Sequence, residues 1–462
     1  MNGVEPERIR RRNDRPDRKG RYVLYWMQQS QRAEDNPALS VAVAEADRRG
    51  LPLAVVFGLT DAYPEANLRH YTFMVEGLRE TLARLADYGI RAAVRRGNPP
   101  DVALAAAAEA ALLVCDAGYL AHQRAWRRKV AGSFDGPVIE IESDVVVPSR
   151  LASNKAEYAA RTFRPRVNRH VERFLTLPKT PAPRTNSRDV DLPGGPDADL
   201  DTLLGALDVD RTIPPVPAFF RGGAGEAKRR FQGFLKDRFH RYVEHRNQPQ
   251  TDDVSHMSPY LHFGQVSPVW LALQARALRD DLPETVDSYL EELIVRRELS
   301  ANYVLQTPDY DRFTALPNWA RKTLQEHRDD PREYHYTIAE LAEAETHDPY
   351  WNAAMREMRV TGFMHNYMRM YWGKKILEWR NTPDHAFHAA LELNNRYFLD
   401  GRDPASFANV AWIFGLHDRA WKERPIFGKV RYMAATGLER KCDIQGYVDK
   451  VARLVQRANT GA

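Results

Sequence analysis

The chain has 462 residues, of which 43% are hydrophobic and 28% charged, and this predicts a folded protein of two or three domains. No run approaches eighteen apolar residues and the charged N-terminus lacks an apolar leader, so neither a membrane span nor secretion is expected. A net charge of +5 weakly favours a polyanionic partner, while two distant cysteines indicate the reducing cytoplasm and predict no metal site.

The N-terminal part predicts a Rossmann-like parallel α/β domain over residues 21–177, after a basic disordered tail over residues 1–20. Short apolar runs alternate with stretches of helical period, which is typical of a parallel sheet covered by helices on both faces. Because no glycine-rich phosphate loop is present, a ligand of this domain is expected by position alone, at the carboxyl ends of the strands. The predicted strands are 22–26, 52–59, 92–94, 111–117 and 137–143.

The remainder of the chain predicts a long linker and an all-helical domain. Residues 178–217 are rich in proline, glycine and aspartate, which is typical of a linker that runs over the surface. From residue 218 to residue 462, helical stretches joined by loops with proline or glycine replace the strand pattern. One of these stretches, 348–379, is expected to be helical throughout.

The predicted helix over 361–379 places a cation among tryptophans. At 100° per residue, Arg369, Trp372, Ile376 and Trp379 share one face. The simplest interpretation is a buried helix whose arginine is paired with a carboxylate. An arginine among large aromatic side chains needs an acid or an anionic ligand to offset its desolvation. Spaced tryptophans are, in addition, what a relay of single electrons requires.

Three further segments have two interpretations each. In 393–433, a turn with two aspartates precedes tryptophans interleaved with cations, which suits either turn closure beside a solvated face or base stacking with phosphate neutralisation. The polar loop 242–268 is either an ordinary loop or a source of hydrogen-bond donors for a pyrophosphate. Glu292 and Arg296, four residues apart, predict an ordinary surface pair unless a ligand uses them.

Five motifs together resemble the class II cyclobutane pyrimidine dimer photolyases of the cryptochrome/photolyase superfamily. They are SPYLHFGQVSP, EELIVRRELSANY, HNYMRMYWGKKILEW, LDGRDP and HDRAWKERPIFGKVRYM. The resemblance implies a deoxyribodipyrimidine photo-lyase whose helical domain binds two-electron-reduced FAD and repairs a dimer flipped out of DNA, using light. It implies a DNA-associated, cytoplasmic protein that we expect to be a monomer. For the antenna in the N-terminal domain, a deazaflavin, another chromophore or none are left open.

The resemblance also implies roles for individual residues, and no metal. Val295 is a departure, because class I photolyases have a tryptophan wall of the dimer pocket at this position. The implied residues are the flavin contacts Tyr242, Ser255, Met257, Ser258, Arg369, Asn394, Asp400 and Asp403; the catalytic and dimer-pocket residues Glu292, Met370, Asn394 and Trp412; the electron-transfer tryptophans Trp351, Trp372 and Trp379; and the DNA contacts Arg419, Lys429 and Arg431.

Two other functions fit parts of the sequence. A cryptochrome-like photosensor would share the fold and the flavin but lack repair; the dimer-pocket residues and the expectation of no long signalling tail after Ala462 argue against it. A flavin-free, basic nucleic-acid-binding protein would leave the arginine and the tryptophans of 361–379 without a purpose. A visible spectrum and a repair assay separate these three hypotheses.

Overall fold

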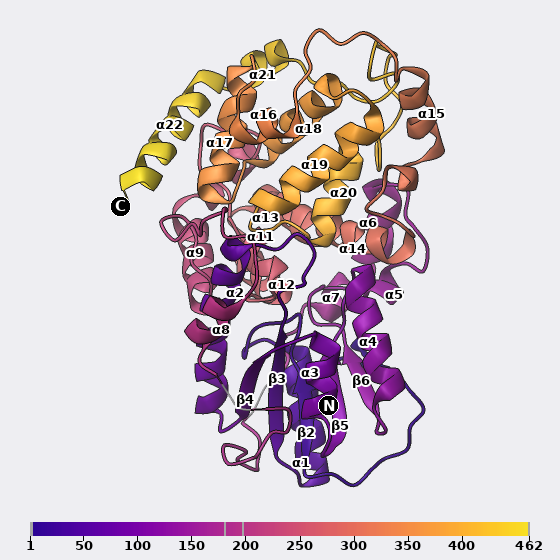
Figure 1. Cartoon of the computed structure of the whole chain (residues 1–462), viewed down its shortest axis with the longest axis vertical. Helices are drawn as coiled ribbons and strands as arrows, with labels where there is room; N and C mark the ends of the chain where they lie inside the picture. Colours follow the sequence, from indigo (N-terminus) through magenta and orange to yellow (C-terminus); the bar gives the residue numbers. More distant parts are fainter. Residues whose placement is uncertain (1–2, 180–181, 196–197, 461–462) are drawn as a thin grey trace.

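The computed structural model describes residues 3–179, 182–195 and 198–460. An α/β part occupies the lower half of Figure 1 and a helical part the upper half. Within the described residues, one sheet has the strand order β1-β6-β5-β2-β3-β4, in which β2 to β6 are mutually parallel. The predicted combination of a parallel α/β domain with a helical domain is therefore confirmed. The strands are β1 Ile9–Arg11, β2 Tyr22–Trp26, β3 Leu53–Leu59, β4 Arg91–Arg96, β5 Ala110–Asp116 and β6 Val138–Ile141.

The central strands are buried on both faces, which explains why they are apolar without alternation. Side chains of β2 point alternately to the two sides of the sheet. Val23 and Tyr25 pack in the cluster that includes helix α1 (Pro37–Arg49). Leu24 and Trp26 pack in the opposite cluster, with residues of α3 and α4. The helices of this part are α1, α2 Leu68–Asp87, α3 Pro99–Ala106, α4 Ala121–Ser133, α5 Ser149–Ala152, α6 Ala160–Asn168 and α7 Val171–Phe174.

The prediction of a disordered tail over residues 1–20 is wrong for residues 6–11. Residues 6–8 form a short 3-10 helix, and β1 pairs antiparallel with the edge strand β6. Arg8 is buried, and its guanidinium donates to the carbonyl oxygens of Val145 (2.9 Å) and Val146 (2.6 Å). A single arginine thus ties this segment to the α/β part, and the open edge of β6 supplies the backbone partners that β1 needs.

The linker segment lies against the sheet and contains a helix. In residues 182–195, the Ser187 hydroxyl accepts from the Arg91 amide (2.8 Å), and Arg95 donates to the Leu192 carbonyl (2.6 Å). Helix α8 (Leu200–Ala206) follows, capped by the Asp199 carboxylate and anchored by buried leucines. Through these contacts, the described part of the linker packs against the edge strand β4.

The helical part surrounds two large apolar clusters. One of these clusters includes the tryptophans of α17 and α18, and the other joins the helical part to the α/β part. Its helices are α9 Ala224–Asp237, η2 Phe239–Arg241, α10 Tyr242–His245, α11 Ser258–His262, α12 Pro268–Arg276, α13 Pro283–Leu290, the π-helical segment η3 Glu291–Arg296, α14 Arg297–Gln306, η4 Phe313–Ala315, α15 Asn318–Glu326, α16 Ile338–Glu343, α17 Pro349–Thr361, α18 Asn366–Trp379, α19 Pro383–Tyr397, α20 Pro404–Ile413, α21 Ala435–Lys441 and α22 Ile444–Thr460. No helix in the described ranges is long and apolar enough to cross a membrane.

The helix predicted over 348–379 is interrupted, which corrects the sequence prediction. Helix α17 ends at Thr361 and is capped by Gly362, whose φ of 73° is the left-handed conformation that ends many helices. The side chain of His365 then accepts from the Tyr367 amide and caps the start of α18. Because of this break, α17 folds back against α18 (Figure 1), so that residues of both helices face each other.

Glu298 of α14 connects the two parts of the molecule. Its fully buried carboxyl group accepts from the amides of Val146 (2.5 Å) and Val147 (3.3 Å), which follow β6. Burial is the main cause that raises the pKa of Glu298 from 4.5 to about 8, although the two amides oppose the shift. The proton is therefore retained in the folded protein at pH values where the unfolded chain has lost it.

This difference predicts a pH-dependent contribution to stability. For an acid with a raised folded-state pKa, the unfolded state loses its proton first, so stability falls as the pH rises between the two pKa values. The Glu298→Gln variant should gain stability relative to the wild type by up to about 1.4 kcal/mol for each pH unit between about 5 and 8. Urea unfolding at several pH values measures this difference. The exposed Glu284→Gln change is the control, and equal pH profiles for both variants would contradict the role of Glu298.

Candidate active site

Arg369 and Asp400 form a paired charge in the interior of the helical part. Arg369 lies on α18 and Asp400 on the turn after α19, and both nitrogen–oxygen distances of the bidentate pair are 3.1 Å. The guanidinium also lies 3.9 Å from the ring centre of Phe398 and donates to the Met364 carbonyl (3.0 Å). The carboxylate that the sequence required for this arginine is thus Asp400. The pair fixes the plane of the guanidinium in one orientation.

Three buried tryptophans form a continuous stack in an order that the sequence does not show. Trp351 of α17 stacks on Trp372 with ring centres 6.5 Å apart and an interplanar angle of 9°. The same Trp351 contacts Trp379 edge-on at 5.5 Å. Trp372 and Trp379 share one face of α18, but Trp351 lies between them and bonds through Nε1 to the Trp372 carbonyl (2.9 Å). Trp379 continues the series toward Tyr336, at 5.3 Å.

Unpaired buried nitrogen atoms lie next to this pair and this stack. His365 Nε2 and Trp372 Nε1 are buried and have no hydrogen-bond partner among the described residues. Burial is the first cause that lowers the pKa of His365 to about 3, so the ring is neutral. Buried polar atoms are normally paired, and unpaired ones at a candidate site fit a bound polar molecule that supplies their partners.

The polar loop after α10 lies against the same region. The His256 ring contacts the Phe363 ring edge-on at 4.6 Å, and Phe363 in turn lies 5.5 Å from the Arg369 guanidinium. Tyr242 packs against Tyr289 at 5.7 Å and is almost fully buried. The structure therefore brings the loop with Ser255, Met257 and Ser258 to the Arg369 side of the helical part.

Asp403 caps the helix that follows its turn, α20. Its carboxylate accepts from the Ala405 amide (2.9 Å) and caps α20, and its other oxygen lies 3.4 Å from His262 Nδ1. It faces the α/β part, whereas Asp400 faces Arg369. Its role as a flavin contact stays a prediction.

The π-helical segment η3 contains Glu292 and changes which side chains pair. Glu292 is bound by Arg246, with Nη2 and Oε1 2.5 Å apart, and Arg246 also donates to Ser288 Oγ (2.7 Å). The predicted pair of Glu292 with Arg296 is wrong, because the π-helical register turns Arg296 toward Glu291 (3.1 Å). Arg246 was not predicted as a site residue; its place four residues after Tyr242 in one polar loop was the only signal.

Met370 and Trp412 lie at the margin of the main apolar cluster, and both are half-buried. Trp412 of α20 has the buried Lys374 ammonium 5.2 Å from its ring and the Arg431 guanidinium 5.5 Å from it. Burial lowers the pKa of Lys374 to about 7. Asn394 is buried on α19 and donates to the Asn395 side chain (3.0 Å). The basic side chains of Lys374 and Arg431 therefore both lie over the Trp412 ring.

The three predicted DNA contacts differ in how freely they could reach a phosphate. Arg431 is bound to Asp418 (2.8 and 3.1 Å) and lies 4.3 Å from the Trp421 ring. Arg419 is exposed, and its guanidinium lies 4.9 Å from the same Trp421 ring. Lys429 is exposed, with Glu423 3.8 Å away. Their roles in binding DNA stay predictions.

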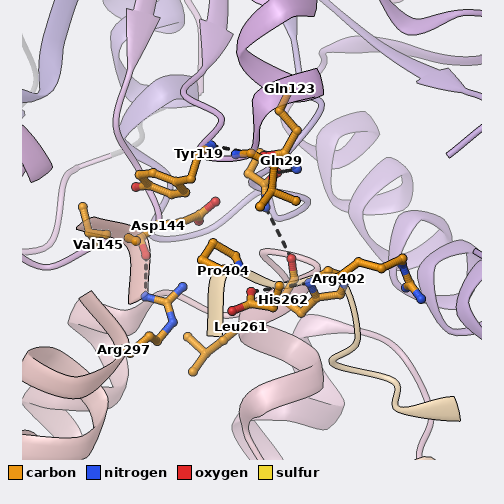
Figure 2. Close-up of a pocket in the computed structure, with 13 residues that line it drawn as sticks. Gln29, Tyr119, Gln123, Asp144, Val145, Leu261, His262, Arg297, Arg402 and Pro404 are labelled. Carbon is orange, nitrogen blue, oxygen red and sulfur yellow. Dashed lines mark hydrogen bonds and ion pairs between the residues drawn. The ribbon is translucent and has the colours of Figure 1, made fainter. Parts of the chain in front are cut away.

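Two adjoining cavities lie between the α/β part and the helical part. Figure 2 shows the smaller one, of about 420 Å³, where Gln29 donates to the His262 carbonyl (3.3 Å) and Arg297 donates to the Asp144 carbonyl (2.6 Å). The larger one, of about 600 Å³, opens at the carboxyl ends of β2 and β3, beside Tyr63 and Trp126. This is the end of the sheet where the sequence placed a ligand.

Comparisons with known proteins agree with this architecture. The DNA photolyase family matches residues 23–184. A deoxyribodipyrimidine photo-lyase of Methanothermobacter thermautotrophicus is 48% identical over 98% of this chain and 99% of its own, and one of Arabidopsis thaliana is 39% identical over 94% and 89%. The crystal structure of a class III photolyase from Agrobacterium tumefaciens shares the fold, with a TM-score of 0.74, 17% identity and coverage of 94% and 87%.

The α/β sheet followed by a helical domain is the fold of the photolyase and cryptochrome structures. The family match and the identity to relatives over nearly the whole chain place the protein in the photolyase/cryptochrome superfamily. Within it, the chain belongs to the deoxyribodipyrimidine photo-lyase family of enzymes, as its identity to relatives over nearly the whole length shows.

Proposed function

We propose that this protein is a class II photolyase that repairs cyclobutane pyrimidine dimers in DNA, using light and FAD. The observation that supports this most strongly is the bidentate Arg369–Asp400 pair beside the unpaired nitrogens of His365 and Trp372, next to the tryptophan stack. A paired cation, unpaired polar atoms and a chain of oxidisable rings suit a buried redox cofactor. The relatives named deoxyribodipyrimidine photo-lyase support the reaction.

The residues present fit a flavin. Arg369 and Asp400 would orient its ring system, Asn394 would face the ring, and the loop residues Tyr242, Ser255, Met257 and Ser258 would hold its phosphates and ribityl chain. When bound in its reduced form, FAD would supply the light-excited electron that splits the cyclobutane ring. Trp372, Trp351 and Trp379 would carry electrons inward from the surface. Their burial keeps water away from the stack.

Glu292, Met370 and Trp412 would form the pocket for the dimer. The salt bridge with Arg246 holds one oxygen of Glu292 and orients the carboxylate so that Oε2 can accept from a donor at the edge of the dimer. Met370 and Trp412 would provide apolar walls. Arg419, Lys429 and Arg431 would bind the phosphates of the strand.

Replacing Glu292 by alanine should reduce repair while the flavin stays bound. Loss of a hydrogen bond to a charged group costs about 1.5–3 kcal/mol, which corresponds to a roughly 10- to 100-fold loss in repair rate. Repair of a dimer-containing oligonucleotide by reduced enzyme measures the effect. Glu291→Ala is the matched control, because Glu291 lies in the same π-helical segment but pairs with Arg164 and Arg296 on the surface. Equal losses in both variants would contradict a direct contact of Glu292 with the dimer.

The family resemblance and the cavities also support a second chromophore, an antenna. A deazaflavin-type antenna would lie in the larger cavity at the carboxyl ends of β2 and β3. Mass spectrometry of chromophores released from the purified protein tests this, with a deazaflavin expected. We further propose a monomer that works on DNA in the cytoplasm.

Two measurements on the purified protein test the proposed function. A visible spectrum should show flavin bands, and illumination of a dimer-containing oligonucleotide with reduced protein should restore the thymines. A spectrum without flavin would refute the proposal. Flavin bands without restored thymines would favour a cryptochrome-like photosensor.

A further inference from the structure

Tyr158 is the most exposed large hydrophobic side chain among those described. It is 57% exposed, compared with 38% for Trp421 and 37% for Tyr334. It lies just before α6, in the segment that follows the α/β sheet, and its hydroxyl donates to the Asp418 carbonyl (3.3 Å) across 260 residues of sequence. A single exposed ring is common, but a ring beside cations is able to stack on a nucleic-acid base.

The backbone beneath Tyr158 is firmly held. The Glu157 amide donates to Asn302 Oδ1 (2.9 Å), and Asn302 Nδ2 donates to the Lys155 carbonyl (2.9 Å). The Glu157 side chain is buried and bonds Ser153 (2.7 Å). The contacts of residues 155 and 157 with Asn302 of α14 therefore hold the backbone just before Tyr158. Figure 1 shows α6 beside the helical part, where it contacts η3.

Two exposed cations of the segment around Tyr158, Lys155 and Arg161, form no salt bridge within the described residues. By contrast, Arg164 is paired with Glu291 (2.7 Å), and Arg166 with Glu157 (3.0 Å). Unpaired cations beside an exposed ring are the combination that single-stranded nucleic acids bind, through phosphate neutralisation and base stacking.

Tyr158 is also continuous with the proposed DNA surface. Asp418, whose carbonyl receives the Tyr158 hydroxyl, binds Arg431 through its carboxylate. Arg431 in turn lies over both Trp421 and Trp412. A path of direct contacts thus leads from the proposed dimer pocket, through Arg431 and Asp418, to Tyr158.

We propose that Tyr158, with Lys155 and Arg161, forms an extension of the DNA-binding surface on which an unpaired base of the DNA stacks. The inference rests on the proposed function. Flipping a dimer out of a duplex leaves bases without partners beside the opening, and such bases expose their π faces. The Tyr158 ring supplies a flat partner for one of them, and the two cations neutralise the neighbouring phosphates.

The test compares variants of the full-length protein on a duplex that contains one dimer, with binding measured by fluorescence anisotropy. Tyr158→Ala should weaken binding by about tenfold, the effect of losing one base–aromatic stack, without changing the salt dependence. Tyr158→Phe should retain binding, because stacking needs the ring and not the hydroxyl. Tyr334→Ala, which removes a ring of lesser exposure from another region, is the control and should bind as the wild type does.

Two further readouts separate stacking from a structural role. A 2-aminopurine opposite the dimer should be quenched by the wild type and less by Tyr158→Ala, while flavin content and melting temperature stay unchanged. The double change Lys155→Ala with Arg161→Ala should lower the slope of log binding constant against log salt by about 0.7–0.9 for each phosphate that the variant no longer neutralises.

The outcomes against the proposal are distinct. Unchanged binding and quenching in Tyr158→Ala would overturn it and assign the surface to another partner. A loss in Tyr158→Phe equal to that in Tyr158→Ala would also overturn it, because the bond to Asp418 would then be the cause. If the wild type itself failed to bind or repair the duplex, the proposed function would fail instead.

Discussion

Replacing Asp400 by alanine is expected to yield a protein that purifies without flavin. Asp400 is the carboxylate partner of Arg369, and the guanidinium lies between Phe398 and Phe363. Removing the acid leaves a largely buried cation without its counter-charge, which costs about 3 kcal/mol or more. Arg369 should then turn away from its present orientation and no longer reach the flavin ring in the proposed way.

The ratio of flavin to protein absorbance measures this effect, and urea unfolding measures the cost in stability. Asp384→Ala is a suitable control, because Asp384 is an exposed acid at the start of α19, while Asp400 follows the end of that helix. Asp400→Asn should fall between the two, since it keeps acceptor geometry but loses the charge. A full flavin content in Asp400→Ala, together with lowered stability, would show that the pair serves the fold alone.

Replacing Trp351 by phenylalanine should slow light-driven reduction of oxidised flavin at least about tenfold, while repair by chemically reduced protein continues. Trp351 contacts both Trp372 and Trp379, and it is the ring that links them in the stack. Phenylalanine keeps most of the packing but is far harder to oxidise. A rise of only about 1.4 kcal/mol in the barrier of one transfer slows it tenfold, so reduction should be at least about tenfold slower.

Flavin reduction is measured as the loss of oxidised-flavin absorbance under continuous light in the presence of an external reductant. Repair is measured separately, with dithionite-reduced protein and a dimer-containing oligonucleotide. Trp319→Phe is the control, because this half-buried tryptophan lies outside the stack. Equal losses of reduction and repair in Trp351→Phe would refute a relay and indicate a disturbed core. Unchanged reduction would show that electrons bypass Trp351.

Much of the fold could be predicted because its signals are local. Strands β2 and β3 are apolar throughout, β5 is apolar up to Asp116, and all three alternate with helical periods, so a buried parallel sheet follows directly. Strand β1 could not be found in this way, since Ile9–Arg11 is short and charged and is held by the edge of β6. The break at Gly362 was present as a glycine, yet the strong helical period on both sides concealed it.

The sequence predicted which residues belong to the candidate site, but only part of how they are arranged in space. The helical period alone placed Arg369, Trp372 and Trp379 on one face, and they lie on one face of α18. The pairing of Glu292 with Arg246 could not be predicted, because the π-helical turn of η3 shifts the register and has no sequence period of its own.

The sequence by itself therefore determined the residue types, the order of the two domains and the faces of individual helices, because backbone geometry fixes these locally. Only the tertiary structure decided that Trp351 lies between Trp372 and Trp379, that Asp400 faces Arg369, and that Tyr158 meets Asp418. Each of these contacts joins residues on different elements. Their distances depend on how whole helices pack against one another, and no local pattern in the chain records that packing.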